Sequence, residues 1–263
     1  MDFSNIKYSV LENVALMVLN RPKVLNSINT ELAGELQYAL SDSGDNPEVR
    51  AILLTGNGKG FCAGQDLNEA LQPNGTPESD LGIFVRENYN PIIKLLREIP
   101  KPIICAVNGT AAGAGANIAL ACDIVVASEN ASFIQAFSKI GLIPDSGGTY
   151  YLPRLVGLGK AASLMMLGEK LLANEAMELG LIYKVFPLDK LEEESINLAK
   201  HLAAQPTKAL GLIKKLLNKS IENTLDEQLK LEEEMQRIAG QTDDYKEGIK
   251  AFLEKRKPEF KGK

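Results

Sequence analysis

The segment Gly109-Thr-Ala-Ala-Gly-Ala-Gly-Ala-Asn-Ile-Ala-Leu-Ala-Cys-Asp123 lies at the centre of the sequence pattern. It follows Lys101–Asn108, whose nearly continuous apolar, β-branched run predicts a buried parallel strand. Residues 109–116 are all Gly, Ala or Thr, and the sequence after them predicts the start of a helix. A helix that begins after such a turn directs free backbone N–H groups at whatever binds there. The same small residues also suit close packing of a helix on a sheet, so both roles stay open at this point.

The pair Gly113-Ala-Gly115 after a predicted strand is also how a dinucleotide-binding fingerprint begins. That fingerprint needs a third glycine at position 118, where this chain has Ile118. It also needs an acidic residue after a second strand, and none stands in that register. We therefore exclude NAD or FAD binding by this turn, whereas stabilisation of an anion by its backbone amides is still open.

The composition narrows the classes of function. The chain has 263 residues, of which 45% are hydrophobic and 24% charged, as in a globular domain with a large core. Its net charge of −5 argues against a nucleic-acid-binding protein. The three cysteines, Cys62, Cys105 and Cys122, have no metal-ligand spacing. Because no signal segment or 18-residue apolar run occurs, we expect a soluble, cytoplasmic protein that binds neither nucleic acid nor membrane.

Alternating strand and helix patterns precede a wholly helical C-terminal part. Strands are predicted at 8–12, 14–19, 51–55, 101–108, 123–127, 131–135 and 181–186. Helices are predicted at 30–41, 84–98, 150–155, 159–167 and 173–179, and then at 188–203, 206–221, 225–239 and 243–255. Residues 68–82, which contain two prolines, predict a surface loop or an irregular helix. This order indicates an α/β core followed by a helical module.

A second turn of small residues, Gly60-Phe-Cys-Ala-Gly-Gln-Asp-Leu67, also follows a predicted strand. Each of the two turns can point one backbone N–H at a shared place, and two such donors form an oxyanion hole. The only histidine, His201, lies in the predicted C-terminal helices between Lys200 and Leu202. Ser–His–Asp and Cys–His chemistries are therefore excluded.

Four motifs in the same order and spacing resemble the crotonase (enoyl-CoA hydratase/isomerase) superfamily. They are Asn20-Arg-Pro with Leu25-Asn-Ser-Ile-Asn29, Gly60–Leu67, Lys101-Pro with Ala106-Val-Asn-Gly109, and Gly141-Leu-Ile-Pro-Asp-Ser-Gly-Gly-Thr149. The resemblance runs from about residue 7 to the C-terminus. It implies the α/β crotonase (ClpP-like) fold of repeated ββα units, with a spiral core over 1–200 and a C-terminal α-helical trimerisation module over 201–263. The implied assembly is a homotrimer or a dimer of trimers.

The resemblance also implies how an acyl-CoA thioester binds. In the family two backbone amides hold the thioester oxygen, and the aligned N–H groups here are those of Gln65 and Ala114. Coenzyme A is then part of the substrate, and neither a cofactor nor a metal is expected. The residues implied to contact CoA or the acyl group are Lys23, Val24, Leu25, Ala63, Asp66, Leu67, Asn68, Asn117 and Phe137.

The residues at the positions of the family's catalytic carboxylates indicate which reaction the chain can catalyse. Family hydratases use two glutamates, and the aligned positions here hold Asn117 and Phe137. Addition of water to a double bond needs one group to activate the water and another to protonate carbon. Asparagine and phenylalanine supply neither, so we expect very weak hydratase activity. Apolar Phe137 instead suits contact with the acyl group.

Asp145, in Ile143-Pro-Asp-Ser-Gly147, is the acid that remains beside the expected site. Family isomerases and a dehalogenase place an acidic residue near this position, and one carboxylate is enough to move a proton between two carbons. The structural alternative is a helix N-cap, a position that aspartate favours. Because both hydratase glutamates are missing, we expect Asp145 to be the catalytic acid–base group.

The expected function is therefore that of an acyl-CoA isomerase. A narrower resemblance, to family isomerases of phenylacetate degradation, rests on motifs such as Tyr89-Asn90-Pro91, Ala136-Phe-Ser-Lys139 and Tyr245-Lys-Glu-Gly248. It implies conversion of ring-1,2-epoxyphenylacetyl-CoA to an oxepin thioester, or a shift of 3-enoyl-CoA to 2-enoyl-CoA. Two alternatives stay open: a hydratase that pairs Asp145 with Glu69 or Asp66, and a catalytically silent acyl-CoA-binding subunit.

Overall fold

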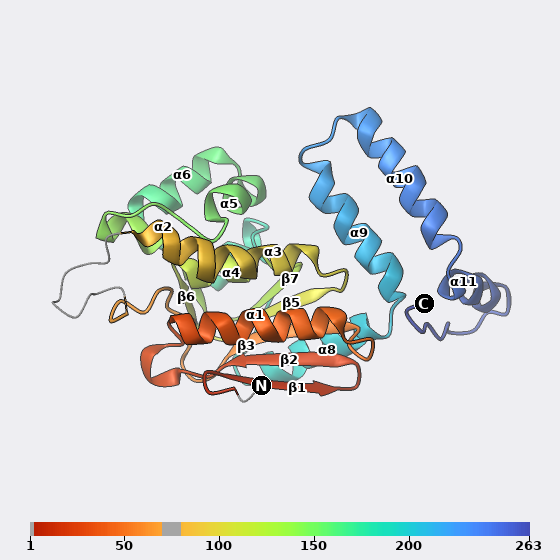
Figure 1. Cartoon of the computed structure of the whole chain (residues 1–263), viewed down its shortest axis with the longest axis horizontal. Helices are drawn as coiled ribbons and strands as arrows, with labels where there is room; N and C mark the ends of the chain where they lie inside the picture. Colours follow the sequence, from red (N-terminus) through yellow and green to blue (C-terminus); the bar gives the residue numbers. More distant parts are fainter. Residues whose placement is uncertain (1–2, 70–79) are drawn as a thin grey trace.

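The computed structural model describes residues 3–69 and 80–263, and the part it describes contains two sheets (Figure 1). The large sheet has the order β1 (Ile6–Leu11), β2 (Val14–Leu19), β3 (Ala51–Gly56), β5 (Ile103–Val107), β7 (Ile124–Ser128) and β10 (Lys184–Phe186). The small sheet has the order β4 (Gly60–Cys62), β6 (Thr110–Ala112), β8 (Ser132–Ile134) and β9 (Lys170–Leu172). The β1–β2 hairpin and the β8–β9 pair are antiparallel, and the other pairs are parallel.

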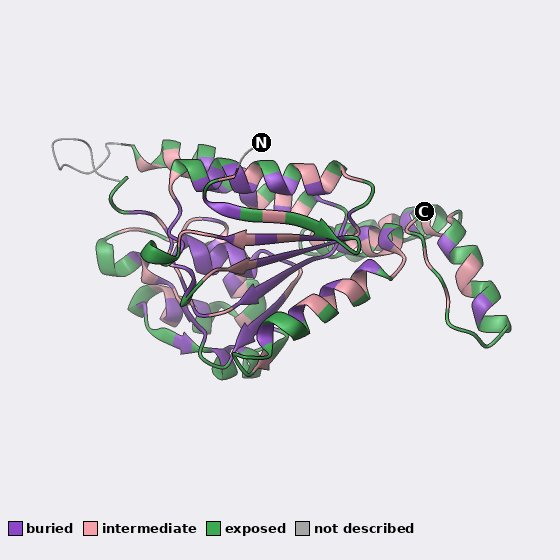
Figure 2. Cartoon of the chain, turned by 90° about the horizontal axis from the view of Figure 1, so that it is seen from below, coloured by how far each residue is buried: buried purple, intermediate pink, exposed green. Residues whose placement is uncertain are grey.

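The central strands of the large sheet, β2, β3, β5 and β7, are largely buried on both faces (Figure 2), whereas the edge strands β1 and β10 are partly exposed. Successive side chains of a strand point to opposite faces, so Ile52 and Leu54 of β3 join one cluster and Leu53 joins another. The first cluster is covered by α1 (Thr30–Asp45) and α3 (Asn90–Glu98). The second is covered by α8 (Leu191–Ala203). Burial on both faces explains the continuous apolar runs of the sequence.

The ββα repeat predicted by the resemblance is confirmed. β3 and β4 lead to α2 (Leu81–Phe84) and α3, and β5 and β6 lead to α4 (Ala114–Leu120). β7 and β8 lead to η3 (Ala136–Ile140) and α5 (Gly148–Val156). Because β4, β6 and β8 are parallel neighbours, the segments that follow them lie at one edge of the small sheet. The predicted oxyanion and acid–base residues belong to these segments and therefore lie at that edge.

Several elements differ from the sequence prediction. The helix predicted over 84–98 consists of the end of α2, a π-helical turn η2 (Val85–Tyr89) and α3. The helix predicted over 30–41 extends to Asp45. β4, β6 and β9 were not predicted, because three-residue strands are too short to show a two-residue period. Most of the loop expected over 68–82 lies outside the described residues.

The remaining elements complete the core and form a helical arm. α6 (Leu158–Leu167) and α7 (Ala173–Glu178) follow α5. The arm consists of α9 (Thr207–Ser220), α10 (Leu225–Ala239) and α11 (Asp243–Leu253), and it extends away from the sheets (Figure 1). The expected boundary at residue 200 falls inside α8, which packs on the large sheet. Among the described residues, no helix combines the length and the apolar character needed to cross a bilayer. The role of the arm in oligomerisation stays a prediction.

Candidate active site

The two turns of small residues lie against each other. Gly64, after β4, has φ +92°, and a Cβ there would be 2.9 Å from the carbonyl oxygen of Ala112 and 3.5 Å from the amide nitrogen of Ala114. Gly113, after β6, has φ 54° and ψ −128°, a conformation that suits glycine. A Cβ on Gly113 would be 3.9 Å from the Cα of Gly64. The close approach of the turns thus requires glycine at position 64, whereas at position 113 it is the positive φ that favours glycine.

The amides expected to hold a thioester oxygen belong to these turns. Among residues 3–69 and 80–263, neither the N–H of Gln65 nor that of Ala114 has a hydrogen-bond acceptor. Their neighbours do: the N–H of Asp66 donates to the carbonyl of Ile28 at 2.9 Å, and that of Gly113 to the carbonyl of Ile134 at 2.9 Å. Two donors in adjacent turns are the arrangement that an oxyanion hole needs. Their role stays a prediction.

The residues expected to contact CoA form a neighbouring surface. The 3-10 turn η1 (Pro22–Val24) carries Lys23 and Val24, and Leu25 follows it. The N–H of Ala63 donates to the carbonyl of Leu25 at 2.9 Å, which joins this turn to the oxyanion turns. The side chains on this surface that are exposed are those of Lys23, Val24, Leu25, Leu67 and Asn68.

Two carboxylates considered as a second acid are both engaged by protein groups. Asp66 is 7% exposed and pairs with Arg21 at 2.9 Å. Burial opposes its ionisation, but hydrogen bonds from Arg21 and from the N–H of Asn68 outweigh burial and lower the pKa of Asp66. Glu69 accepts from the N–H of Thr30 at 2.8 Å, in the first turn of α1. Both carboxylates therefore already accept hydrogen bonds from protein groups that take no part in the predicted chemistry.

Asp145 lies in the loop between η3 and α5. The N-cap residue of α5 is Gly147, and it makes no side-chain cap hydrogen bond, so the alternative role of Asp145 as an N-cap is wrong. Its carboxylate accepts from the Ser146 hydroxyl at 2.9 Å. Burial raises the pKa of Asp145 to about 6, although the Ser146 hydroxyl and the N–H of Asp145 itself act to lower it. A carboxyl with this pKa is suited to giving and taking protons near neutral pH.

Asn117 connects Asp145 to the oxyanion turns. It is 1% exposed and lies in α4, three residues after Ala114. Its side-chain amide donates to the backbone carbonyl of Asp145 at 2.9 Å and accepts from the Gln135 amide at 2.7 Å. A Cβ on Gly148 would be 2.3 Å from the Asn117 amide nitrogen, so glycine is required there. Asn117, which the resemblance aligns with a hydratase glutamate, thus holds the loop that carries Asp145.

Phe137, which the resemblance aligns with the second hydratase glutamate, is 5% exposed. Its ring atom Cζ is 3.7 Å from the place that a Cβ on Gly113 would take, so the ring lies against the small-residue turn.

Sequence reasoning missed Gln135 and Ser146, which orient Asn117 and Asp145. Ser146 stands inside the fourth motif and Gln135 outside all four, but no motif assigns partners to these side chains, and their contacts arise only where the end of β8, α4 and the loop before α5 meet.

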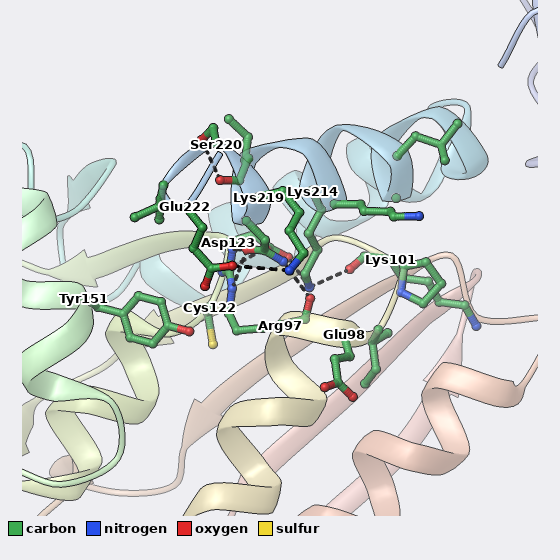
Figure 3. Close-up of a pocket in the computed structure, with 18 of the residues that line it drawn as sticks. Arg97, Glu98, Lys101, Cys122, Asp123, Tyr151, Lys214, Lys219, Ser220 and Glu222 are labelled. Carbon is green, nitrogen blue, oxygen red and sulfur yellow. Dashed lines mark hydrogen bonds and ion pairs between the residues drawn. The ribbon is translucent and has the colours of Figure 1, made fainter. Parts of the chain in front are cut away.

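A large cavity lies elsewhere, between α9 and the helices α3 and α5 (Figure 3). Its volume is about 1130 Å³, and no residue expected at the site lines it. Asp123 lies at its wall and pairs with Arg97 at 3.1 Å and with Lys214 at 2.8 Å. These contacts are satisfied within the chain and attach α9 to the core.

Known proteins resemble the whole chain. A model of the family described as enoyl-CoA hydratase/isomerase matches residues 10–263. The chain is 51% identical over 255 residues to the 1,2-epoxyphenylacetyl-CoA isomerase of Escherichia coli strain K12, with 97% of each covered. It is 37% identical over 263 residues to the trans-2-decenoyl-[acyl-carrier-protein] isomerase of Streptococcus mutans, with 100% of each covered. The crystal structure of the enoyl-CoA hydratase of Bacillus anthracis matches with a TM-score of 0.91 and 36% identity, over 99% of this chain and 100% of that one.

These matches extend over nearly the whole chain and confirm the resemblance that four sequence motifs predicted. They include proteins named as isomerases and proteins named as hydratases. The chain belongs to the enoyl-CoA hydratase/isomerase family of the crotonase superfamily.

Proposed function

We propose that the chain is an acyl-CoA isomerase in which Asp145 is the acid–base group and the N–H groups of Gln65 and Ala114 hold the thioester oxygen. The observation that carries this proposal is the raised pKa of the Asp145 carboxyl group. Burial raises its pKa to about 6, and Asn117 links its loop to the helix that begins at Ala114. The two positions that hold glutamates in hydratases are Asn117 and Phe137.

The proposed reaction moves one proton within one substrate. For a 3-enoyl thioester, the Asp145 carboxylate takes a proton from C2, and the C2–H electron pair forms a dienolate whose negative oxygen is held by the two amides. The protonated Asp145 then returns the proton to C4. The double bond between C3 and C4 is lost and one between C2 and C3 is formed. The atoms balance without a second reactant, so we propose that no cofactor takes part and that coenzyme A is only the carrier.

We propose ring-1,2-epoxyphenylacetyl-CoA as a substrate, to be converted to an oxepin thioester, because the E. coli relative at 51% identity carries that substrate in its name. Its carbon next to the thioester carbonyl bears the same acidic protons as C2 of a 3-enoyl group. Apolar, buried Phe137 suits contact with such a ring. We also propose that the exposed surface around Lys23 and Asn68 contacts CoA, and that the arm forms a homotrimer or a dimer of trimers.

Hydration is the competing reaction, because several relatives are named as hydratases. It would require a second carboxylate to work with Asp145. Asp66 is held by Arg21, and Glu69 accepts from the N–H of Thr30. We therefore favour isomerisation over hydration, and over a catalytically silent subunit.

The test is conversion of 3-hexenoyl-CoA to the conjugated 2-enoyl thioester, followed by ultraviolet absorbance, with hydration of crotonyl-CoA measured on the same samples. Asp145→Asn should lower isomerisation by about 10²–10⁴-fold, the contribution of a general base. Asp243→Asn, which changes an exposed aspartate of the arm, is the matched control and should retain activity. Isomerisation that survives in Asp145→Asn would overturn the mechanism. Hydration as fast as isomerisation would show that another acid of this chain is catalytic.

A further inference from the structure

The hydroxyl of Tyr89 is buried without a hydrogen-bond partner. The residue is 0% exposed, and its hydroxyl oxygen has neither a donor nor an acceptor among residues 3–69 and 80–263. Buried polar groups in native proteins are nearly always paired, so an orphan of this kind requires an explanation. A phenylalanine would pack in the same volume without this cost, which makes the hydroxyl a candidate for binding something absent from the chain.

The backbone around Tyr89 is unusual as well. Tyr89 ends the π-helical turn η2, which interrupts what would otherwise be one helix from α2 to α3. Such turns recur at functional sites, because they rotate the side chains that follow. The ring is held edge-on by Phe84, with centroids 5.2 Å apart. The carbonyl of Asn88 accepts from the Gln37 amide at 3.1 Å, which anchors the turn to α1.

Tyr89 is on the side of the helix that faces the loop of Asp145. Ile93 lies four residues further, so it shares a face with Tyr89. A methyl of Ile93, Cγ2, is 3.5 Å from the place that a Cβ on Gly147 would take, two residues after Asp145. Burial raises the pKa of Tyr89, and the charges of Asp145, Cys62 and Glu69 raise it further. The phenol therefore stays protonated at neutral pH and can only serve as a neutral donor or acceptor.

We propose that the Tyr89 hydroxyl donates a hydrogen bond to an oxygen atom carried by the acyl group of the substrate, and so selects acyl-CoA thioesters with an oxygen on or in the ring. The inference rests on the proposed function and specifies its substrate class. The thioester oxygen already has two candidate donors in Gln65 and Ala114, so a third donor on the Asp145 side has a different acceptor. A lone buried donor favours an acyl group that offers an acceptor, because an acyl group without one leaves the donor unpaired.

The test compares two stable thioesters that differ by one oxygen atom, 2-hydroxyphenylacetyl-CoA and phenylacetyl-CoA. Their dissociation constants would be measured by calorimetry with the wild type, Tyr89→Phe and Asp145→Asn. The wild type should bind the oxygenated thioester about 5–10-fold more tightly, the value of one hydrogen bond. Tyr89→Phe should abolish this preference. Tyr38→Phe, in which a 46% exposed tyrosine of α1 loses its hydroxyl, is the matched control and should keep it.

The outcomes separate the two proposals. A preference that persists in Tyr89→Phe, or that is absent from the wild type, overturns the role of Tyr89. Equal weakening of both thioesters together with a lower melting temperature would also overturn it, because that pattern indicates a packing role. Since the hydroxyl has no partner, Tyr89→Phe should melt no lower than the wild type. Isomerisation of 3-hexenoyl-CoA that survives in Asp145→Asn would remove the proposed mechanism, whereas the ligand preference tests Tyr89 independently.

Discussion

Two aspartates of this chain show how the surroundings of a residue set its chemistry. Asp66 receives hydrogen bonds from Arg21 and from the backbone of Asn68, and these lower its pKa in spite of burial. Asp145 has the Ser146 hydroxyl and its own N–H, which are too weak to offset burial, so its pKa rises to about 6. The first is a permanent anion that organises a turn. The second can exchange a proton near neutral pH, as an isomerase base must.

If Asp145 is the base, as we propose, the pH dependence of isomerisation follows from its pKa. The base acts as a carboxylate, so kcat/KM for 3-hexenoyl-CoA should rise with pH and level off above an apparent pKa of about 6. The measurement is the initial rate at low substrate concentration between pH 4.5 and about 8.5, an interval that contains the midpoint. A rate that falls as the pH rises through this range would show that the protonated form of Asp145 is the active one.

The stability of the protein should also depend on Asp145. The folded pKa of about 6 exceeds the ordinary value of 3.8, so the folded state holds this proton more tightly than the unfolded chain. Stability is therefore lost as the pH rises from about 4 through 6. Asp145→Asn removes this penalty and should raise the free energy of unfolding at pH 7.5 by about 1–3 kcal/mol. Urea unfolding at pH 7.5 and at pH 4 checks the sign, because the gain should vanish at the lower pH. A destabilised Asp145→Asn at pH 7.5 would contradict this account of the carboxylate.

At the scale of elements, the site is assembled by short segments that follow parallel strands. β4 and β6 are neighbours in the small sheet, so the turns after them meet. α4 then carries both Ala114 and Asn117, and Asn117 reaches the loop before α5. The arrangement depends on Gly64, where a Cβ would collide with the facing turn, and on Gly113, whose positive φ is strained for any other residue.

Gly113 is the glycine whose replacement tests this arrangement. Alanine at φ 54° and ψ −128° is strained, and Gly113→Ala should lower the free energy of unfolding by about 1–3 kcal/mol and displace the N–H of Ala114. Gly34→Ala is the control, since Gly34 is inside α1 with nothing within 4 Å of its Cβ position. That variant should be neutral or slightly stabilised. Urea unfolding and isomerase rates measured on both variants decide the matter. Full activity and stability in Gly113→Ala would show that the turn tolerates a side chain.

At the scale of the whole molecule, the arm is attached to the core by charged groups rather than by a large apolar contact. Arg50, next to β3, donates to the carbonyl of Gln205 at 2.6 Å and to the hydroxyl of Thr207 at 2.9 Å. Asp123, just before β7, pairs with Arg97 of α3 and Lys214 of α9. Exposed apolar side chains remain on the arm, including Leu225, Phe252 and Leu253. They suit the proposed oligomer.

Removal of Asp123 should loosen the arm. Asp123→Ala leaves Arg97 and Lys214 without their shared counter-ion and the N–H of Ile103 without its acceptor. The free energy of unfolding should fall by about 2–4 kcal/mol, less than for a fully buried pair because these groups are partly solvated. Glu233→Ala, which breaks an exposed pair with Arg237, should change it little. Denaturant unfolding, with hydrogen exchange of α9 as a local probe, gives the comparison. An Asp123→Ala protein as stable as Glu233→Ala would mean that the arm is held by other contacts.

Elements with long periodic patterns were predictable because the spacing of their apolar residues indicates both the type of element and its buried face. The large sheet, α1 and the helices of the arm were all predicted within a few residues of their bounds. The three-residue strands β4, β6 and β9 and the π-helical turn that ends at Tyr89 were not. Short segments have no period of their own, and tertiary pairing determines their conformation.

The motifs of the sequence were sufficient for the family, and through that resemblance for the ββα repeat, because both depend on motif order. The presence and absence of acidic residues in those motifs led to Asp145 as the proposed base, which stays a prediction. The environment of Asp145 came only from the folded chain. Its raised pKa, the link through Asn117 and Gln135, and the engagement of Asp66 and Glu69 all depend on contacts between distant segments. Desolvation and hydrogen bonding act through space, and only the tertiary structure specifies which groups meet.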